Sequence, residues 1–120
     1  MADDARPAWQ AIYALATAAV IGWCLAYGLA DWGGWPRLTL DAHTGSWSWV
    51  SGPTPRVPIN YYGGLLWGTG GAVTAAALAG LGLRLWRRPL PPALIGLLAA
   101  WAATAVALAG AYYTWMLWPF

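Results

Sequence analysis

Three long apolar runs dominate the chain, and charged residues separate them. No charged residue occurs between Arg6 and Asp31, between Arg56 and Arg84, or after Arg88. A bilayer core about 30 Å thick is crossed by about 20 helical residues, so each run is long enough for one crossing. Inside lipid, only helices and closed barrels satisfy all backbone hydrogen bonds, and non-alternating runs cannot form a barrel. The pattern predicts an all-α integral membrane protein with three transmembrane helices.

Helix-starting and helix-stopping residues set the limits of these segments. Pro7 suits a first helical turn, where its missing N–H is not needed, and Gly33 and Pro36 end the first run. Asn60 is a favourable N-cap, and Pro119 disfavours helix at the residue before it. The expected organisation is a single membrane domain over 1–120, with helices at about 8–30, 61–86 and 93–117, an outer loop at 31–60 and an inner turn at 87–92.

The segment between the first two helices has a different pattern. Residues 38–40 and 46–50 alternate apolar and polar side chains on either side of Thr44 and Gly45. Such alternation around a turn predicts a short β-hairpin in the outer loop. Three prolines follow, which predicts an extended, polyproline-like strap over 52–59.

The arginines predict how the chain is oriented. Arg84, Arg87 and Arg88 lie at the turn between the second and third helices, with no acidic residue near them. Short loops rich in basic residues face the cytoplasm, so this turn and the N-terminus are expected inside, and the 31–60 loop and the C-terminus outside. All six basic residues are arginine, and alanine and glycine are abundant, which is typical of a GC-rich bacterial genome. Together with the orientation, this composition leads us to expect a multi-pass protein of a bacterial inner membrane with a periplasmic C-terminus.

Composition argues against a soluble domain and against a nucleic-acid-binding protein. Only 8% of the residues are charged and 60% are hydrophobic, whereas a soluble domain has about 25% charged residues. The formal net charge of +2 is small and scattered, so no nucleic-acid partner is expected. The lipid bilayer is the expected surrounding.

Eleven tryptophans are unusual in a chain of 120 residues. Most of them map to the outer side, where they form either an aromatic belt at the membrane surface or a docking surface for a periplasmic subunit. The candidate docking residues are Trp32, Trp35, Trp47, Trp49, Tyr112, Tyr113, Trp115 and Trp118. Trp23, Trp67 and Trp101 fall inside the apolar runs instead, where they either pack against a neighbouring helix or serve as contacts for a hydrophobic ligand.

Small residues recur at spacing four along each run. Helices in lipid associate through close packing at such residues. The first helix has Ala14, Ala18, Gly22, Ala26 and Ala30, and the third has Ala99, Ala103, Ala107 and Ala111. In the second helix the candidate helix-packing residues are Gly64, Gly68, Ala72, Ala76 and Gly80.

No pattern typical of catalysis is present. No Asp, Glu, His, Lys or Arg occupies the middle of a predicted helix, which argues against a pump or a proton-coupled transporter. The only histidine, His43, is expected in the outer loop as a solvated turn residue, and the only cysteine, Cys24, as a small apolar residue. We expect no catalytic residue, no metal site and no intrinsic cofactor.

These features favour a non-catalytic accessory subunit of a larger membrane complex, with a photosynthetic or respiratory electron-transfer assembly as the expected host. Its partners would be other membrane subunits, and it could contact a pigment, quinone or lipid held by them. Two alternatives stay open: a membrane binder of a carotenoid, quinone or lipid, and a small homo-oligomeric channel built on the glycine-rich second helix.

Overall fold

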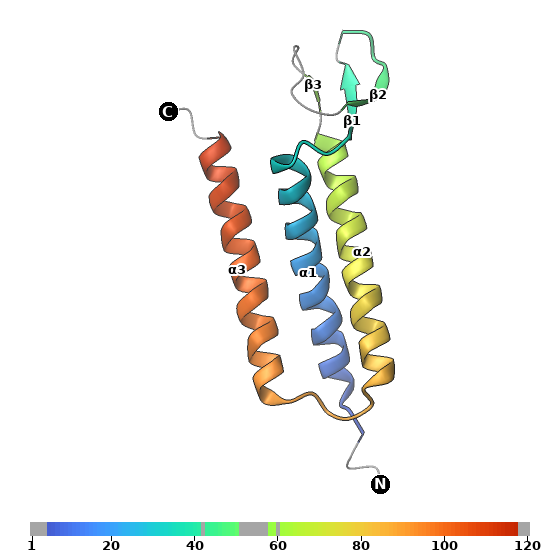
Figure 1. The fold of residues 1–120 in the computed structure, drawn as a ribbon, viewed down its shortest axis with the longest axis vertical. Helices are drawn as coiled ribbons and strands as arrows, with labels where there is room; N and C mark the ends of the chain where they lie inside the picture. Colours follow the sequence, from blue (N-terminus) through green and yellow to red (C-terminus); the bar gives the residue numbers. More distant parts are fainter. Residues whose placement is uncertain (1–4, 42, 51–57, 60, 118–120) are drawn as a thin grey trace.

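Three long helices stand side by side with a small sheet at one end (Figure 1). The computed structural model describes residues 5–41, 43–50, 58–59 and 61–117. The elements are α1 (Ala8–Trp32), β1 (Arg37–Asp41), β2 (Trp47–Val50), β3 (Pro58–Ile59), α2 (Tyr61–Leu85) and α3 (Pro92–Leu117). The sheet end of the bundle carries β1–β3, and the opposite, turn end carries the N-terminal arm and the segment 86–91 (Figure 1).

All three helices are long and apolar enough to cross a membrane, with spans at Ala8–Trp32, Gly63–Leu85 and Pro92–Trp115. This confirms the predicted mostly helical fold, with boundaries within two residues of those expected. α3 begins one residue earlier than expected, at Pro92, because proline is well suited to the first position of a helix.

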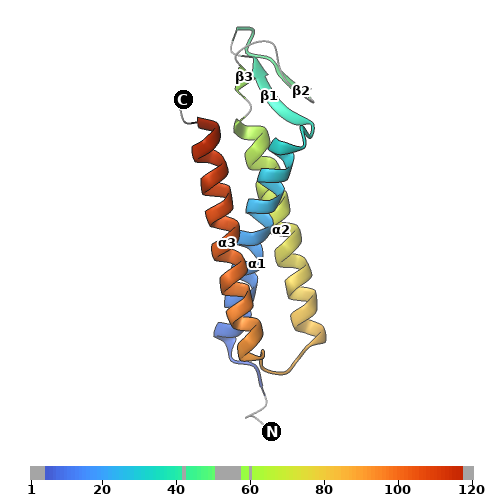
Figure 2. The same cartoon turned by 60° about the vertical axis from the view of Figure 1, so that its left-hand side comes forward.

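Helix α1 lies between α2 and α3 (Figures 1 and 2), and its contact with α2 is the more extensive. Two glycines make this contact close. A Cβ on Gly22 would lie 2.5 Å from the Cβ of Ala75 and closer still to the carbonyl oxygen of Gly71. A Cβ on Gly71 would overlap Ala26 and the carbonyl oxygen of Gly22. The two backbones therefore meet at a distance that only glycine permits.

Two aromatic rings of α1 cover glycines of α2 nearer the sheet end. A Cβ on Gly68 would lie 2.6 Å from Nε1 of Trp23, and a Cβ on Gly64 would lie 2.8 Å from Cε2 of Tyr27. Both glycines are buried. The missing side chains on α2 therefore make the space that the large rings of α1 fill.

The predicted β-hairpin is present. β1 pairs antiparallel with β2 in the register Leu38↔Trp49 and Leu40↔Trp47, and β3 pairs with the other edge of β1. The turn closes through Gly45, which has a φ of 67° and donates its N–H to the carbonyl of Asp41 at 2.8 Å. Of the predicted 52–59 strap, 58–59 form β3 and 52–57 lie outside the described residues.

At the turn end, side chains of the N-terminal arm and of α1 link the three helices. Arg6 donates to the carbonyls of Leu83 (2.8 Å), Arg88 (3.3 Å) and Trp86, and so caps the C-terminus of α2. The buried Gln10 accepts the backbone N–H of Leu90 at 2.8 Å. Tyr13 donates its hydroxyl proton to the carbonyl of Ile95, on the first turn of α3, at 3.0 Å.

Neighbouring glycines of α2 offer a matched test of the α1–α2 contact. Gly71→Ala places a methyl group against Ala26 and Gly22, so we expect a loss of about 1–3 kcal/mol in stability, the usual cost of overpacking. Gly70→Ala meets nothing within 4 Å and is expected to be neutral or slightly stabilising. Thermal unfolding of both variants in detergent checks this, and equal midpoints would contradict the close contact.

Candidate functional site

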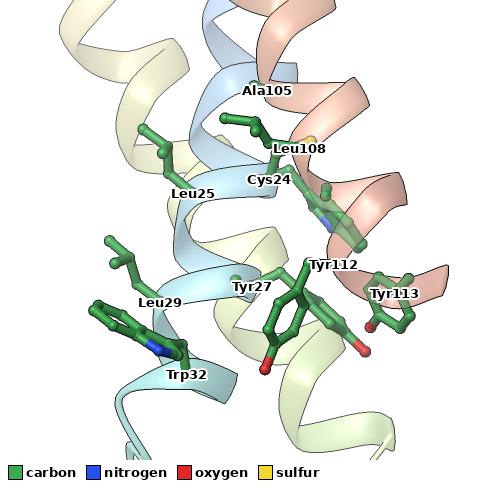
Figure 3. A pocket seen from close by; sticks show the side chains of 12 residues that line it. Cys24, Leu25, Tyr27, Leu29, Trp32, Ala105, Leu108, Tyr112 and Tyr113 are labelled. Carbon is green, nitrogen blue, oxygen red and sulfur yellow. The ribbon is translucent and has the colours of Figure 1, made fainter. Parts of the chain in front are cut away.

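An apolar groove runs between α1 and α3 toward the sheet end (Figure 3). Its volume is about 340 Å³, which is within the range of ligand pockets. Nearly all of the lining atoms are apolar. The lining residues are Trp23, Cys24, Leu25, Tyr27, Gly28, Leu29 and Trp32 of α1 and Ala105, Leu108, Ala109, Tyr112 and Tyr113 of α3. The contact of α3 with α1 is less extensive than that of α2.

Aromatic rings of both helices line the sheet-end part of this groove. The rings of Trp23 and Tyr27 stack with centroids 4.9 Å apart, and Tyr27 meets Tyr113 of α3 at 5.3 Å with a tilt of 43°. Figure 3 shows the tyrosines of the two helices close together at this end. A continuous aromatic surface thus leads from the α1–α2 contact across to α3, and it suits a flat or extended apolar molecule.

An ion pair that we call the rim lies at the sheet end and bonds to Tyr112, which lines the groove. Asp31, in the last turn of α1, pairs with Arg37 through Oδ1 and Nη1 at 2.5 Å, and accepts the hydroxyl of Tyr112 on Oδ2 at 2.7 Å. A carboxylate at a helix C-terminus is destabilised by the negative end of the helix dipole. The bonds from Arg37 and Tyr112 offset this electrostatic cost. One side chain therefore links α1, β1 and α3.

The three tryptophans proposed as ligand contacts lie in different places. Trp23 lines the groove, whereas Trp67 donates its Nε1 proton to the carbonyl of Pro36 at 2.7 Å and meets Trp35 edge-on at 5.0 Å. Trp67 and Trp35 line a separate cavity of about 410 Å³ between α1 and α2. Trp101 is 55% exposed on α3. Trp23 and Trp67 thus line different cavities, and Trp101 lines neither of them.

The candidate docking residues belong to elements that meet at the sheet end (Figure 1). Trp32, Trp47, Trp49 and Trp115 are more than half exposed, and Trp35 is less so. The two tyrosines differ from them, because Tyr112 and Tyr113 are half-buried and line the groove. Trp118 lies outside the described residues.

The candidate packing residues of α2 are placed along its length. Gly64 and Gly68 are buried under α1 side chains, Ala72 and Ala76 are half-buried, and a Cβ on Gly80 would lie 3.7 Å from Leu15. Two close contacts on α2, Gly71 and Ala75, were missed by the spacing-four pattern. The contact follows the spacing 64, 68, 71, 75, which is the alternation of four and three residues typical of left-handed helix pairs.

The hairpin turn contains the only histidine of the chain. His43 is exposed, and its backbone N–H donates to Oδ1 of Asp41 at 2.9 Å. This hydrogen bond lowers the pKa of Asp41 below its ordinary value of 3.8, with further lowering from Thr44 and partial opposition from desolvation. In the part of the chain that the structure describes, no three His, Cys, Asp or Glu side chains gather into a metal site.

Comparison with known protein families, curated proteins and solved structures finds no match. Function is therefore argued from the residues themselves.

The Asp41 carboxylate makes the hairpin turn sensitive to acid. Because the pKa of Asp41 is lowered in the folded turn, its contribution to stability is complete above 3.8 and is lost as the pH falls through the lowered value. We expect the His43 and Gly45 amide resonances to shift below about pH 4. Asp41→Asn should remove this titration, and a midpoint at or above 3.8 would contradict the hydrogen bond.

The rim predicts a specific role for one tyrosine. Tyr112→Phe removes the bond to Asp31, so we expect a loss of about 1 kcal/mol and faster amide hydrogen exchange in the sheet-end half of α3. Trp115→Phe is the control, because Trp115 is 82% exposed on the same helix and should leave exchange unchanged. Equal exchange in both variants would show that the bond does not hold α3.

Proposed function

We propose that this chain is a non-catalytic accessory subunit of a multisubunit membrane complex, with a photosynthetic or respiratory electron-transfer assembly as its host. One face of α3 would pack against a helix of a neighbouring subunit. The aromatic residues at the sheet end would dock a partner on the periplasmic side of the membrane.

The observation that carries the proposal is an uncovered face of small residues on α3. At 3.6 residues per turn, one face about a third of the circumference wide holds no large side chain from Ala93 to Thr114. Its members are Ala93, Gly96, Ala99, Ala100, Ala103, Ala107, Gly110, Ala111 and Thr114, and all of them are exposed. We call these residues the small face of α3.

This face points away from the rest of the molecule. The α3 residues that are partly covered, among them Leu98, Ala105 and Tyr112, lie on the opposite side, where α1 packs. Large exposed side chains flank the small face along one edge, namely Leu97, Trp101, Leu108 and Trp115. A smooth strip beside a ridge of large side chains is a shape that a second helix can fit.

The chain already uses small residues for helix contact. Gly22 and Gly71 bring α1 and α2 together without any hydrophobic drive, because lipid is as apolar as the helices. The small face of α3 has the same composition and no partner helix within the described residues. Association with a foreign helix would cover it in the same way.

The arginines support the orientation proposed for this subunit. Arg6, Arg84, Arg87 and Arg88 belong to the turn end, and the short connection there is the segment that the positive-inside rule places in the cytoplasm. The sheet end, with its exposed tryptophans, would then face the periplasm of a bacterial inner membrane.

A second candidate function follows from the groove between α1 and α3. Its aromatic walls and volume of about 340 Å³ favour a hydrophobic small molecule such as a carotenoid, quinone or lipid. Trp23, Tyr27 and Tyr113 would form the contact surface. The molecule could be bound by this chain alone or shared with a neighbouring subunit.

Gentle detergent extraction from native membranes, followed by mass spectrometry and an absorption spectrum of what co-migrates, tests both candidates. We expect larger subunits in the same band. Ala103→Leu places a large side chain in the middle of the small face and should abolish co-migration, because the partner backbone can no longer approach. Ala77→Leu on the exposed side of α2 is the control and should retain the partners.

The other outcomes separate the alternatives. A lone chain carrying a chromophore or quinone would replace the accessory role with small-molecule binding. A closed ring of identical chains that conducts ions would favour the channel instead. A lone chain that carries only bulk lipid would reject all three.

A further inference from the structure

A second apolar groove lies at the turn end, where all three helices contribute to it. Its volume is about 420 Å³, and its lining includes Ala18 of α1, Gly82 and Leu83 of α2, Trp86 and Leu90 of the turn segment and Leu98 of α3. The wall is almost entirely apolar. Such a wall can accommodate the acyl chain of a lipid.

Positive charge lies next to this groove. Arg87 and Arg88 are exposed and occupy the turn directly between two lining residues, Trp86 and Leu90. The guanidinium of Arg6 donates to the backbone carbonyls of Leu83 and Trp86, which are also lining residues. Three arginines are therefore next to residues that line the groove, two through the chain and one through hydrogen bonds.

No described residue neutralises this charge. Among the described residues the acidic ones are Asp31 and Asp41, and both belong to the sheet-end part of the chain, far from the turn. Asp3 and Asp4 precede Arg6 in the sequence but lie outside the described residues. Three arginines at the turn end, Arg84, Arg87 and Arg88, are exposed, so they outnumber Asp3 and Asp4.

We infer that this groove binds an anionic phospholipid, with one acyl chain along the apolar wall and the headgroup phosphate held by Arg87 and Arg88. A guanidinium presents paired donors that match phosphate oxygens, and basic pockets between transmembrane helices bind anionic headgroups. Charge complementarity selects the anionic lipid over a zwitterionic one. The lipid would fill the space between the turn-end halves of the three helices, and this role is independent of any partner subunit.

Native mass spectrometry of the full chain, titrated with dioleoyl phosphatidylglycerol or dioleoyl phosphatidylcholine, tests the charge requirement. We expect the anionic lipid to be retained preferentially. Arg87→Gln combined with Arg88→Gln should weaken its binding by roughly fivefold per arginine. Arg84→Gln is the control, because helical geometry places Arg84 on the side of α2 opposite Ala79, Gly82 and Trp86.

A second pair of variants tests the acyl site without removing charge. A Cβ on Gly82 meets nothing within 4 Å, so a side chain can begin there without a clash, and Gly82→Leu should occupy the groove and displace the lipid. Ala77→Leu is the control, since Ala77 is also exposed on α2 but does not line the groove.

Three outcomes would overturn the inference. Equal retention of the two lipids would remove the charge requirement. An equal effect of Arg84→Gln and the Arg87/Arg88 substitutions would show diffuse attraction to the membrane surface. Unchanged binding in Gly82→Leu would show that no acyl chain occupies the groove.

Discussion

Close backbone contact between Gly22 and Gly71 is the constraint on which the rest of the structure depends. Inside lipid, helices gain nothing by hiding apolar surface from water, so they stay together only where their surfaces fit. Glycine at both positions lets α1 and α2 fit closely, and the glycines at 64 and 68 leave room for Tyr27 and Trp23. Helix α1 is thereby fixed against α2, and its other side is left to receive α3.

Polar bonds at the two ends then position α3, which has no comparable close contact. Tyr13 holds its first turn at the turn end, and Asp31 accepts the hydroxyl of Tyr112 at the sheet end. Between these two points the α1–α3 interface is loose enough to leave an apolar groove. Such bonds are favourable near the membrane surface, where the remaining polar atoms of Asp31 and Arg37 can also meet water.

Some of this fold could be predicted from the sequence, and some could not. Charge-free runs predict the helices because crossing lipid requires them, and alternation around Gly45 predicts the hairpin. The α1–α2 contact at Gly71 was missed because it alternates spacings of four and three, which becomes visible only when both helices are placed. The Asp31 rim joins residues from three elements, so no local pattern in the sequence could indicate it.

The distribution of small residues argues that the bundle is incomplete as a three-helix unit. A helix that needed only to face lipid would not benefit from a face without large side chains, since lipid packs equally well against leucine. On α2, Gly64, Gly68 and Gly71 lie in close contact with α1, whereas Gly70 and Gly82 are open, and on α3 the small residues are exposed from Ala93 to Thr114. Glycine, which costs a soluble helix stability, is here a means of close helix contact. The uncovered side of α3 is therefore where we expect the next helix of a complex to lie.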